Sequence, residues 1–337
     1  MSRLTLALSA CAVALALPFA APAAGSKSWA DRDIRLVAAH GLMGADAATF
    51  RPDEGLTSGE LADLVAGLTG KPAAVSANPE APATISQLDG ALVRGLGLGT
   101  ASREFTAGAR AAGLAPPARF GTETVARLLG FRTDHRVDSL EPSPSAPATR
   151  AEAAFSAAKI LRWKGWEAQY TGGLAETFAP PPVSGWQQTI LRQAVSLVGY
   201  PYIPGGTSER EQEPFGVQVP GGFDCSGLVW RVYKLAGYAV GTSLATTVRG
   251  RTTYAMSREV PRAERVAFAE LEPADVLFFG SRGPRSRPME VDHAGIYLGG
   301  GWMIHASGTG VSPAPLSGTY RTRFAWGRRP LAEAGLE

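Results

Sequence analysis

The sequence predicts an α+β fold for the C-terminal part of the chain, preceded by a mostly helical region. Apolar residues recur at helical spacing through residues 27–165, for example from Leu61 to Leu68. Three consecutive prolines at 180–182 mark a boundary. Beyond Gly237 the pattern changes to short apolar runs separated by glycines, which is typical of strands. Helices followed by a group of strands predict α+β rather than alternating βαβ units.

Length and charge exclude some classes of protein. With 337 residues the chain can hold two domains, each with its own core. The formal net charge is only +3, and Lys and Arg form no dense stripe along the sequence. We therefore expect no nucleic-acid partner, because such proteins concentrate positive charge against phosphates.

The N-terminus predicts an export signal. Arg3 supplies a positive start, an apolar run follows over residues 4–19, and small residues at Ala21 and Ala23 form a cleavage pattern. We therefore assign residues 1–23 to a signal peptide and expect the mature protein to be secreted.

Two alternatives for this segment stay open. One is an uncleaved membrane anchor, which Pro18 and Pro22 disfavour because proline interrupts a spanning helix. The other is lipidation at Cys11, although the apolar run before that residue is short. No later stretch is long and apolar enough to cross a bilayer.

The chain has two cysteines, and removal of the signal leaves only Cys225. An intramolecular disulfide is then impossible. A single unpaired thiol in an exported protein is either reactive or an inert, buried packing residue.

The helical region contains three similar helix starts. Each has threonine followed three residues later by Glu or Gln, the pattern of a capping box, which predicts an imperfect internal repeat. The pairs are Thr57 with Glu60, Thr84 with Gln87, and Thr149 with Glu152.

The prolines at 180–182 lie in a segment, residues 166–185, that we interpret as a stiff linker. An amphipathic helix is predicted over residues 190–199. Strands are predicted at 275–279, 294–298 and 302–305, the last two joined by three glycines.

The residues around Cys225 predict a nucleophile. Asp224 can cap a helix that starts at Cys225 and stops at Gly237, after two flexible glycines at 221 and 222. In the first turn, unpaired N–H groups carry about half a positive charge, which favours thiolate over thiol. We therefore expect a lowered thiol pKa.

Two histidines of the C-terminal part are placed to meet. His293 starts one predicted strand and His305 ends its partner, twelve residues later. A hairpin centred near Gly299 puts them directly opposite each other on one face, with Cβ atoms about 5 Å apart. One imidazole can accept the thiol proton while the other orients it. The remaining histidines, His40 and His135, are interpreted as surface or packing residues.

Residues 186–330 resemble the NlpC-type family of bacterial cell-wall cysteine peptidases, which have a papain-like fold. Several motifs occur in the order of the family. They are Tyr200-Pro201-Tyr202 with Gly205-Gly206, Phe223-Asp224-Cys225-Ser226-Gly227-Leu228, Arg251-Thr252-Thr253, Asp275-Val276-Leu277-Phe278-Phe279, His293-Ala294-Gly295-Ile296-Tyr297-Leu298-Gly299 and Ile304-His305-Ala306.

The resemblance implies a catalytic set of Cys225 as nucleophile, His293 as base and His305 as orienting residue. It also implies that Tyr202 lies beside the thiol. We take Tyr202, Asp224, Ser226 and Arg251 as candidate substrate-binding residues.

The resemblance further implies a monomeric, wall-associated enzyme without metal or cofactor. It would hydrolyse amide bonds of peptidoglycan stem peptides through a thioester, at the bond between D-glutamate and the diamino acid. Acyl transfer from the same thioester stays open.

Three features depart from the family pattern. Pro204 replaces a usual Trp, Ala274 replaces a usual Gly in a turn, and a polar insert at 207–220 precedes the nucleophile loop. We expect a mild effect at Ala274 and a flap from the insert.

Residues 27–165 resemble S-layer homology repeats, small helical units that hold proteins to wall polysaccharide. The family run Thr149-Arg150-Ala151-Glu152 is intact once, and Arg150 occupies the polymer-contacting position. The alternative is a helical spacer or a chaperone-like pro-region.

Two other functions are weighed for the whole chain. One is a catalytically silent wall-binding protein. The other is a zinc site made from Cys225, Asp292, His293 and His305, disfavoured because Asp292 should point to the opposite strand face from His293.

Overall fold

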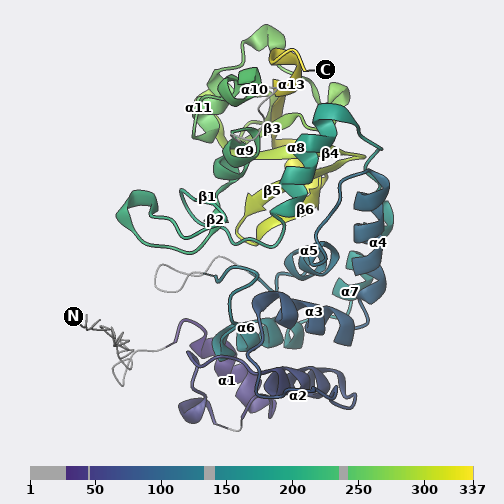
Figure 1. Cartoon of the computed structure of the whole chain (residues 1–337), viewed down its shortest axis with the longest axis vertical. Coiled ribbons are helices and arrows are strands. Elements are labelled where there is room, and N and C mark those ends of the chain that lie inside the picture. The colour runs from purple at the N-terminus through teal and green to yellow at the C-terminus, as the bar shows by residue number, and fades with distance from the viewer. Residues whose placement is uncertain (1–27, 45, 133–140, 235–241, 337) are drawn as a thin grey trace, which may run out of the picture.

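A computed structural model describes residues 28–44, 46–132, 141–234 and 242–336 (Figure 1). The predicted signal peptide, Cys11 and His135 lie outside these ranges. His40 is exposed at the end of the first helix. Within the described ranges, no helix combines the length and apolar character needed to cross a bilayer.

The N-terminal region is helical, as its periodicity predicts, and lies below the sheet-containing region in Figure 1. Its helices are α1 (Asp31–Ala39), α2 (Ser58–Thr69), α3 (Ile85–Gly95), α4 (Gly99–Ala111), α5 (Phe120–Leu128), α6 (Arg150–Leu161) and α7 (Glu167–Thr177), with a short 3₁₀ turn at Ala47–Thr49. The interpretation of residues 166–185 as a linker is wrong in its first half, because α7 packs against α4.

The three predicted helix starts meet at one place. The backbone N–H of Leu56 donates to Ala148 O, that of Ala148 to Ala83 O, and that of Ala83 to Leu56 O, each at 2.8 Å. This closed ring of hydrogen bonds brings the N-termini of α2, α3 and α6 together. The three segments therefore occupy equivalent positions in this ring, and the internal repeat stays a prediction.

Two of the three predicted capping boxes are complete. Thr57 and Thr84 each exchange side-chain and backbone hydrogen bonds with the residue three positions on. At the third, Thr149 accepts the Glu152 N–H at 3.2 Å, but the Glu152 carboxylate accepts from Arg132 at 2.6 Å. The Glu152 carboxylate therefore binds the buried Arg132 guanidinium instead of completing the capping box.

The C-terminal region combines helices with an antiparallel sheet, as predicted. Its helices are α8 (Gly185–Ser196), α9 (Cys225–Tyr233), α10 (Thr242–Thr247), α11 (Thr253–Arg258), α12 (Gly318–Arg323) and α13 (Pro330–Glu333). Its strands are β1 (Thr207–Ser208), β2 (Gly222–Phe223), β3 (Val276–Gly280), β4 (Val291–Gly299), β5 (Trp302–Ser307), β6 (Gly310–Pro315) and β7 (Phe324–Arg328).

Strands β3 to β7 form one sheet in the order β6-β5-β4-β3-β7. The sequence analysis missed β6 and β7. Strand β6 contains Pro313 and Pro315, and it lies at the sheet edge, where missing N–H donors are tolerated. Beyond that edge, Val311 of β6 exchanges backbone hydrogen bonds with Gly199 and Tyr200.

Strand alternation separates the two faces of the sheet. Val276 and Phe278 of β3 belong to the core shared with α8 and α9, whereas Leu277 and Phe279 face a smaller cluster on the other side. This is the period-2 pattern expected of a sheet covered on both faces. The packing holds the N-terminus of α9 against β4 and β5.

Ala274 occupies a strained backbone position before β3. Its φ is +73°, in the left-handed region, which costs a residue with a Cβ about 1–2 kcal/mol. Its N–H donates to Tyr297 O at 2.9 Å, and its carbonyl accepts the Tyr233 hydroxyl. The tertiary contacts therefore hold alanine in a conformation that favours glycine.

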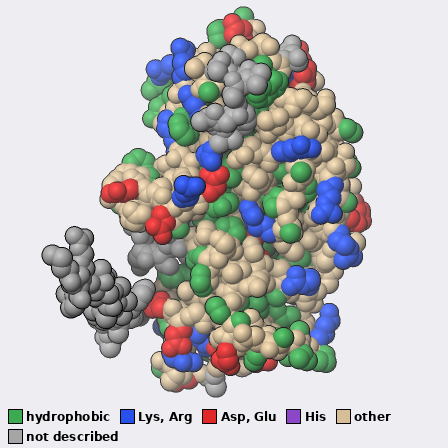
Figure 2. All heavy atoms as spheres, in the orientation of Figure 1, with side chains coloured by type: hydrophobic (Ala, Val, Ile, Leu, Met, Phe, Trp, Pro, Cys, Tyr) green, Lys and Arg blue, Asp and Glu red, His purple; other side chains and the backbone are tan. Residues whose placement is uncertain are grey.

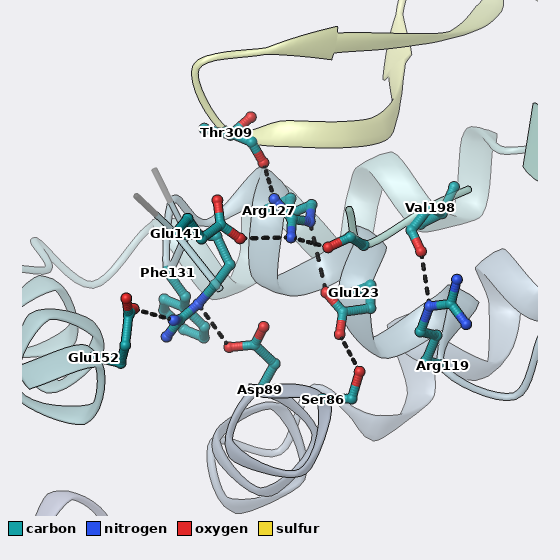
Figure 3. Close-up of polar contacts among 12 residues, drawn as sticks. Ser86, Asp89, Arg119, Glu123, Arg127, Phe131, Glu141, Glu152, Val198 and Thr309 are labelled. Atoms are coloured by element: carbon teal, nitrogen blue, oxygen red, sulfur yellow. Dashed lines mark hydrogen bonds and ion pairs between the residues drawn. The ribbon is translucent and has the colours of Figure 1, made fainter. Parts of the chain in front are cut away.

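The helical region contains a buried charge network that reaches the C-terminal region through Arg127 (Figure 3). It contains two more carboxylates than guanidinium groups. Each member has a side chain that is at most 3% exposed. The members are Asp89 of α3, Glu123 and Arg127 of α5, Arg132 and Glu141 from the segment between α5 and α6, and Glu152 of α6. Burial raises the pKa of three of them, Glu123, Glu141 and Glu152, to about 7.

We predict that Glu123 makes stability fall as pH rises. Burial raises its pKa from 4.5 to about 7, with Asp89 and Glu141 adding repulsion and Arg127 and Ser86 opposing it. Between about pH 4.5 and 7 the folded chain therefore keeps a proton on Glu123 that the unfolded chain has released. The free energy of unfolding falls as pH rises through this range.

The Glu123→Gln variant, measured by thermal unfolding from pH 5 to 8, should gain Tm relative to the parent as pH rises. Glu176→Gln, at an exposed position of α7, is the control and should show no such trend. A parent-to-variant difference that stays constant over this pH range contradicts the prediction.

Candidate active site

Cys225 begins helix α9, as the sequence predicts. Asp224 caps the helix, its Oδ1 accepting the backbone N–H of Gly227 at 2.5 Å. A Cβ at residue 227 would collide with the carbonyl oxygen of Gly206, so only glycine permits this close approach. The motif therefore fixes the thiol at the helix N-terminus, beside the loop at Gly205 and Gly206.

The thiol lies in a tight, nearly buried position against β4. Cys225 is 7% exposed, and the backbone N–H of Ala294 on β4 points to its sulfur, together with the N–H groups of Ser226 and Cys225 itself. Burial nevertheless raises the pKa of the thiol to about 11, and the charge of Asp224 adds to the rise.

The expectation of a lowered thiol pKa is therefore wrong for the free site. Desolvation of a thiolate outweighs the partial positive charge of the helix end. At neutral pH the sulfur carries its proton, and the proton must leave when the sulfur reacts.

His293 and His305 form a hydrogen-bonded pair. His293 Nε2 lies 2.8 Å from His305 Nδ1, with the rings nearly perpendicular at 84°. The predicted common face is confirmed, but the predicted direct opposition is wrong. Ile296 pairs with Ile304, so the partner of His305 is Gly295, and His293 lies on the diagonal.

The glycine turn explains this register. The hairpin turns at Gly300 and Gly301, both with positive φ, and the register shifts between Tyr297 and Gly299. Two consecutive positive φ values are typical of a two-residue hairpin turn. The turn centre is thus displaced from Gly299, which moves His305 by two positions along β4.

Both imidazoles are neutral at neutral pH. Burial lowers the pKa of His293 to about 4, against the opposite effect of the Asp292 charge. Burial and the neighbouring His293 hold the pKa of His305 well below its usual range. Because Nε2 of His293 is bonded to His305, Nδ1 is the nitrogen that can face the thiol.

Two neighbours of the imidazoles were missed by the sequence analysis. The Tyr320 ring of α12 lies 5.1 Å from the His305 ring and 6.0 Å from the His293 ring. Arg323 of the same helix pairs with Asp292 at 2.5 Å. The segment Gly318–Arg323 is polar and short, so no periodicity signals that it covers a site.

Three of the four candidate substrate-binding residues form one cluster. Arg251 Nη1 donates to Asp224 Oδ1 at 3.1 Å and to Ser226 Oγ at 2.8 Å, and its Nη2 donates to Gly205 O at 2.9 Å. The fourth, Tyr202, pairs its backbone with Phe223, two residues before the thiol. All four thus surround the nucleophile loop, and contact with a substrate stays a prediction.

The polar insert forms an arm that projects from the body (Figure 1). Strands β1 and β2 pair at its base, and Glu209 is bonded to Arg231 of α9 at 2.9 Å. Figure 2 shows acidic and apolar side chains on this lobe, and the insert contains two well-exposed apolar residues, Phe215 at 85% and Val217 at 59%. Pro204 is exposed near its base. A role of the arm as a flap stays a prediction.

The geometry does not assemble the zinc alternative. The Asp292 side chain is 59% exposed and pairs with Arg323. Among the residues that the structure describes, no group of three or more His, Cys, Asp or Glu is placed to hold a metal ion.

The C-terminal region is thus an α+β domain in which a thiol at a helix N-terminus packs on a strand pair that carries two hydrogen-bonded imidazoles, residue types that can support nucleophilic catalysis. Residues 199–329 match the model of the NlpC/P60 family. This part of the chain is therefore an NlpC/P60 domain, and it lies within the predicted domain at 186–330.

Several relatives share this similarity. A "Probable endopeptidase" of Mycobacterium tuberculosis is 35% identical over 135 residues, 40% of this chain and 27% of the relative. A gamma-D-glutamyl-L-lysine dipeptidyl-peptidase of Bacillus subtilis is 27% identical over 134 residues, 39% of this chain and 36% of the relative. Murein DD-endopeptidase MepH of Escherichia coli is 32% identical over 143 residues, 41% of this chain and 44% of the relative. The chain spans less than half the length of each.

We predict slow alkylation of Cys225 at neutral pH. Because only thiolate reacts and the thiol pKa is raised to about 11, the rate with iodoacetamide should still be climbing at pH 10. The increase should be roughly tenfold per pH unit between pH 8 and 10. Mass spectrometry of the peptide that contains Cys225 measures the rate, with the denatured chain as reference. A plateau below pH 8 contradicts the prediction and indicates a stabilised thiolate.

Proposed function

We propose that the chain is a cysteine peptidase that hydrolyses amide bonds in the stem peptides of peptidoglycan. One observation carries the proposal: the Cys225 sulfur lies against Ala294, the residue that follows His293, while His293 is held by His305. The relatives, which are named as endopeptidases and a dipeptidyl-peptidase, support the substrate class.

The mechanism uses a neutral thiol and a neutral imidazole. As Cys225 Sγ attacks the amide carbonyl, its proton moves to Nδ1 of His293, while the Nε2 proton of His293 stays bonded to His305 Nδ1. The oxyanion accepts the backbone N–H of Cys225 at the start of α9. Because the thiolate appears only during attack, this general-base step replaces a pre-formed ion pair.

Collapse of the tetrahedral intermediate breaks the C–N bond. The leaving amine takes the proton from His293 Nδ1, and a thioester to Cys225 remains. Water then loses a proton to His293 and adds to the thioester carbonyl. Breakage of the C–S bond returns the proton to sulfur and releases a carboxylic acid. An amine in place of water would give acyl transfer by the same route.

The bond that we favour joins D-glutamate to the diamino acid. The name of the Bacillus subtilis relative describes cleavage next to D-glutamate, whereas that of the Escherichia coli relative describes a DD-endopeptidase. Digestion of purified muropeptides followed by mass spectrometry separates these two bonds, because the products differ in mass.

The proposal places the enzyme outside the cytoplasm, at the wall, as the predicted signal peptide implies. The helical region would contact wall polysaccharide there. Arg150 is a poorly placed polymer contact, because the residue is only 6% exposed. Its guanidinium donates hydrogen bonds within the protein, to Phe50 O, Met43 O and the Glu60 carboxylate. A polysaccharide contact would therefore use other residues of this region.

We expect that Cys225→Ala abolishes muropeptide cleavage while the fold is retained. His293→Ala should lower kcat by about 10²–10⁴-fold, the usual contribution of a general base. His305→Ala should cost less, because it removes orientation and leaves the base in place. Tyr254→Phe, at an exposed position of α11, is the control. Cleavage by Cys225→Ala at the parent rate would falsify the thiol mechanism and leave the silent wall-binding alternative or another activity.

The acid limb of kcat/KM should lie well below pH 6.5. His293 must be neutral to accept the thiol proton, and burial lowers its pKa to about 4, so activity should persist as pH falls until that range is reached. The measurement is kcat/KM on a soluble muropeptide between pH 4 and 8, corrected for unfolding. A limb centred near pH 6.5 contradicts a desolvated base.

A further inference from the structure

The helical region and the catalytic domain share a buried interface. Trp302, the first residue of β5, packs against Phe105 and Phe178 with ring separations of 5.6 and 5.0 Å, and its indole N–H donates to Thr177 O at 3.1 Å. Arg119 donates to Val198 O at 2.9 Å. The two regions are therefore packed together rather than tethered.

Arg127 lies at the centre of the polar part of this interface (Figure 3). Its fully buried guanidinium donates to the carbonyl oxygens of Gly199 and Thr309, both in the catalytic domain. On its own side, Nη2 donates to Glu141 Oε1 at 2.8 Å, and Nε lies 3.6 Å from Glu123 Oε2. The carboxylates hold the cation, and the cation holds two loops of the neighbouring domain.

Both loops lead directly into the candidate active site. Gly199 starts the segment that reaches Tyr202, whose backbone pairs with Phe223 beside the nucleophile. Thr309 lies in the turn between β5 and β6, four residues after His305. Arg127 thus joins the segment that carries Tyr202 to the turn that follows His305.

The next residue, Gly310, shows how closely Arg127 approaches this turn. A Cβ at Gly310 would collide with the Arg127 guanidinium, and φ there is +79°. Val311 then hydrogen-bonds Tyr200 at 2.8 Å, so the two loops also contact each other. Arg127 completes a three-way junction that neither loop forms alone.

We propose that Arg127 is a positioning residue for the peptidase reaction, through which the helical region holds the Tyr202 and His305 segments in register. The inference rests on the proposed function. It makes the helical region part of the catalytic unit, in addition to any contact with the wall. Lysine cannot replace Arg127, because a single ammonium lacks the planar fork that reaches two carbonyls and a carboxylate at once.

The same network provides a matched control. Arg132 is as deeply buried as Arg127, but its partners Asp89, Glu152 and Ser156 all belong to the helical region. Arg132→Lys therefore reports the cost of disturbing a buried guanidinium, without loss of a contact to the catalytic domain.

The experiment compares the parent chain, Arg127→Lys and Arg132→Lys. We expect Arg127→Lys to lower kcat for a muropeptide about 10- to 100-fold with KM nearly unchanged, as for misplacement of catalytic groups on the scale of 1 Å. Arg132→Lys should lower Tm by a similar amount and keep kcat within about twofold of the parent. Unchanged kcat in folded Arg127→Lys, or an equal kcat loss in Arg132→Lys, overturns the inference.

If Arg127→Lys does not fold, the double variant Arg127→Gln with Glu141→Gln takes its place in the comparison. This double variant removes the cation together with one buried carboxylate. Hydrogen exchange gives a readout that needs no activity. Exchange at residues 199–202 and 305–311 should accelerate in the Arg127 variants and not in Arg132→Lys. Equal protection of these segments in all variants overturns the positioning role. Absence of cleavage by the parent chain itself would instead refute the proposed function.

Discussion

The candidate site depends on the pairing of β4 with β5. That register puts His293 and His305 on one face of the sheet, close enough for a hydrogen bond of 2.8 Å between their rings. The bond occupies Nε2 of His293 and leaves Nδ1 for proton transfer. A one-residue slip would place one imidazole on the opposite face, whereas the two-residue displacement from direct opposition preserves the face. The glycine turn at Gly300 and Gly301 therefore determines whether the chain has a base with a fixed tautomer.

Burial then determines the protonation states in this site. The same desolvation raises the pKa of Cys225 to about 11 and lowers that of His293 to about 4, so both groups are neutral in the free site. A site with this arrangement does not store a thiolate. In the reaction that we propose, charge separates during attack, and the N–H groups of α9 and of Ala294 then stabilise the negative charge as it forms. A closed neutral site also protects the thiol from oxidation and unwanted exchange.

The helical region adds a second constraint, a buried cluster in which carboxylates outnumber guanidinium groups. Such a cluster is costly to desolvate, and loss of one partner of a buried ion pair typically costs about 3–5 kcal/mol. Arg127 uses these carboxylates to present its remaining donors to Gly199 and Thr309. The desolvation cost of the cluster is therefore linked to a specific arrangement of the two regions, which Arg127 holds together. The raised pKa values of Glu123 and Glu141 further link that arrangement to pH.

The sequence by itself determined the local features: the helix start at Cys225 and the strands with His293 and His305. These follow from capping residues, period-2 runs and glycine turns, which act over a few positions. Only the tertiary structure decided the thiol pKa, the diagonal register and the contacts of Tyr320. It also decided that Glu123 and Arg127, an i,i+4 pair typical of an exposed helix face, would be buried at a domain interface. The physical reason is that desolvation and long-range packing depend on segments distant in the chain, which local pattern does not encode.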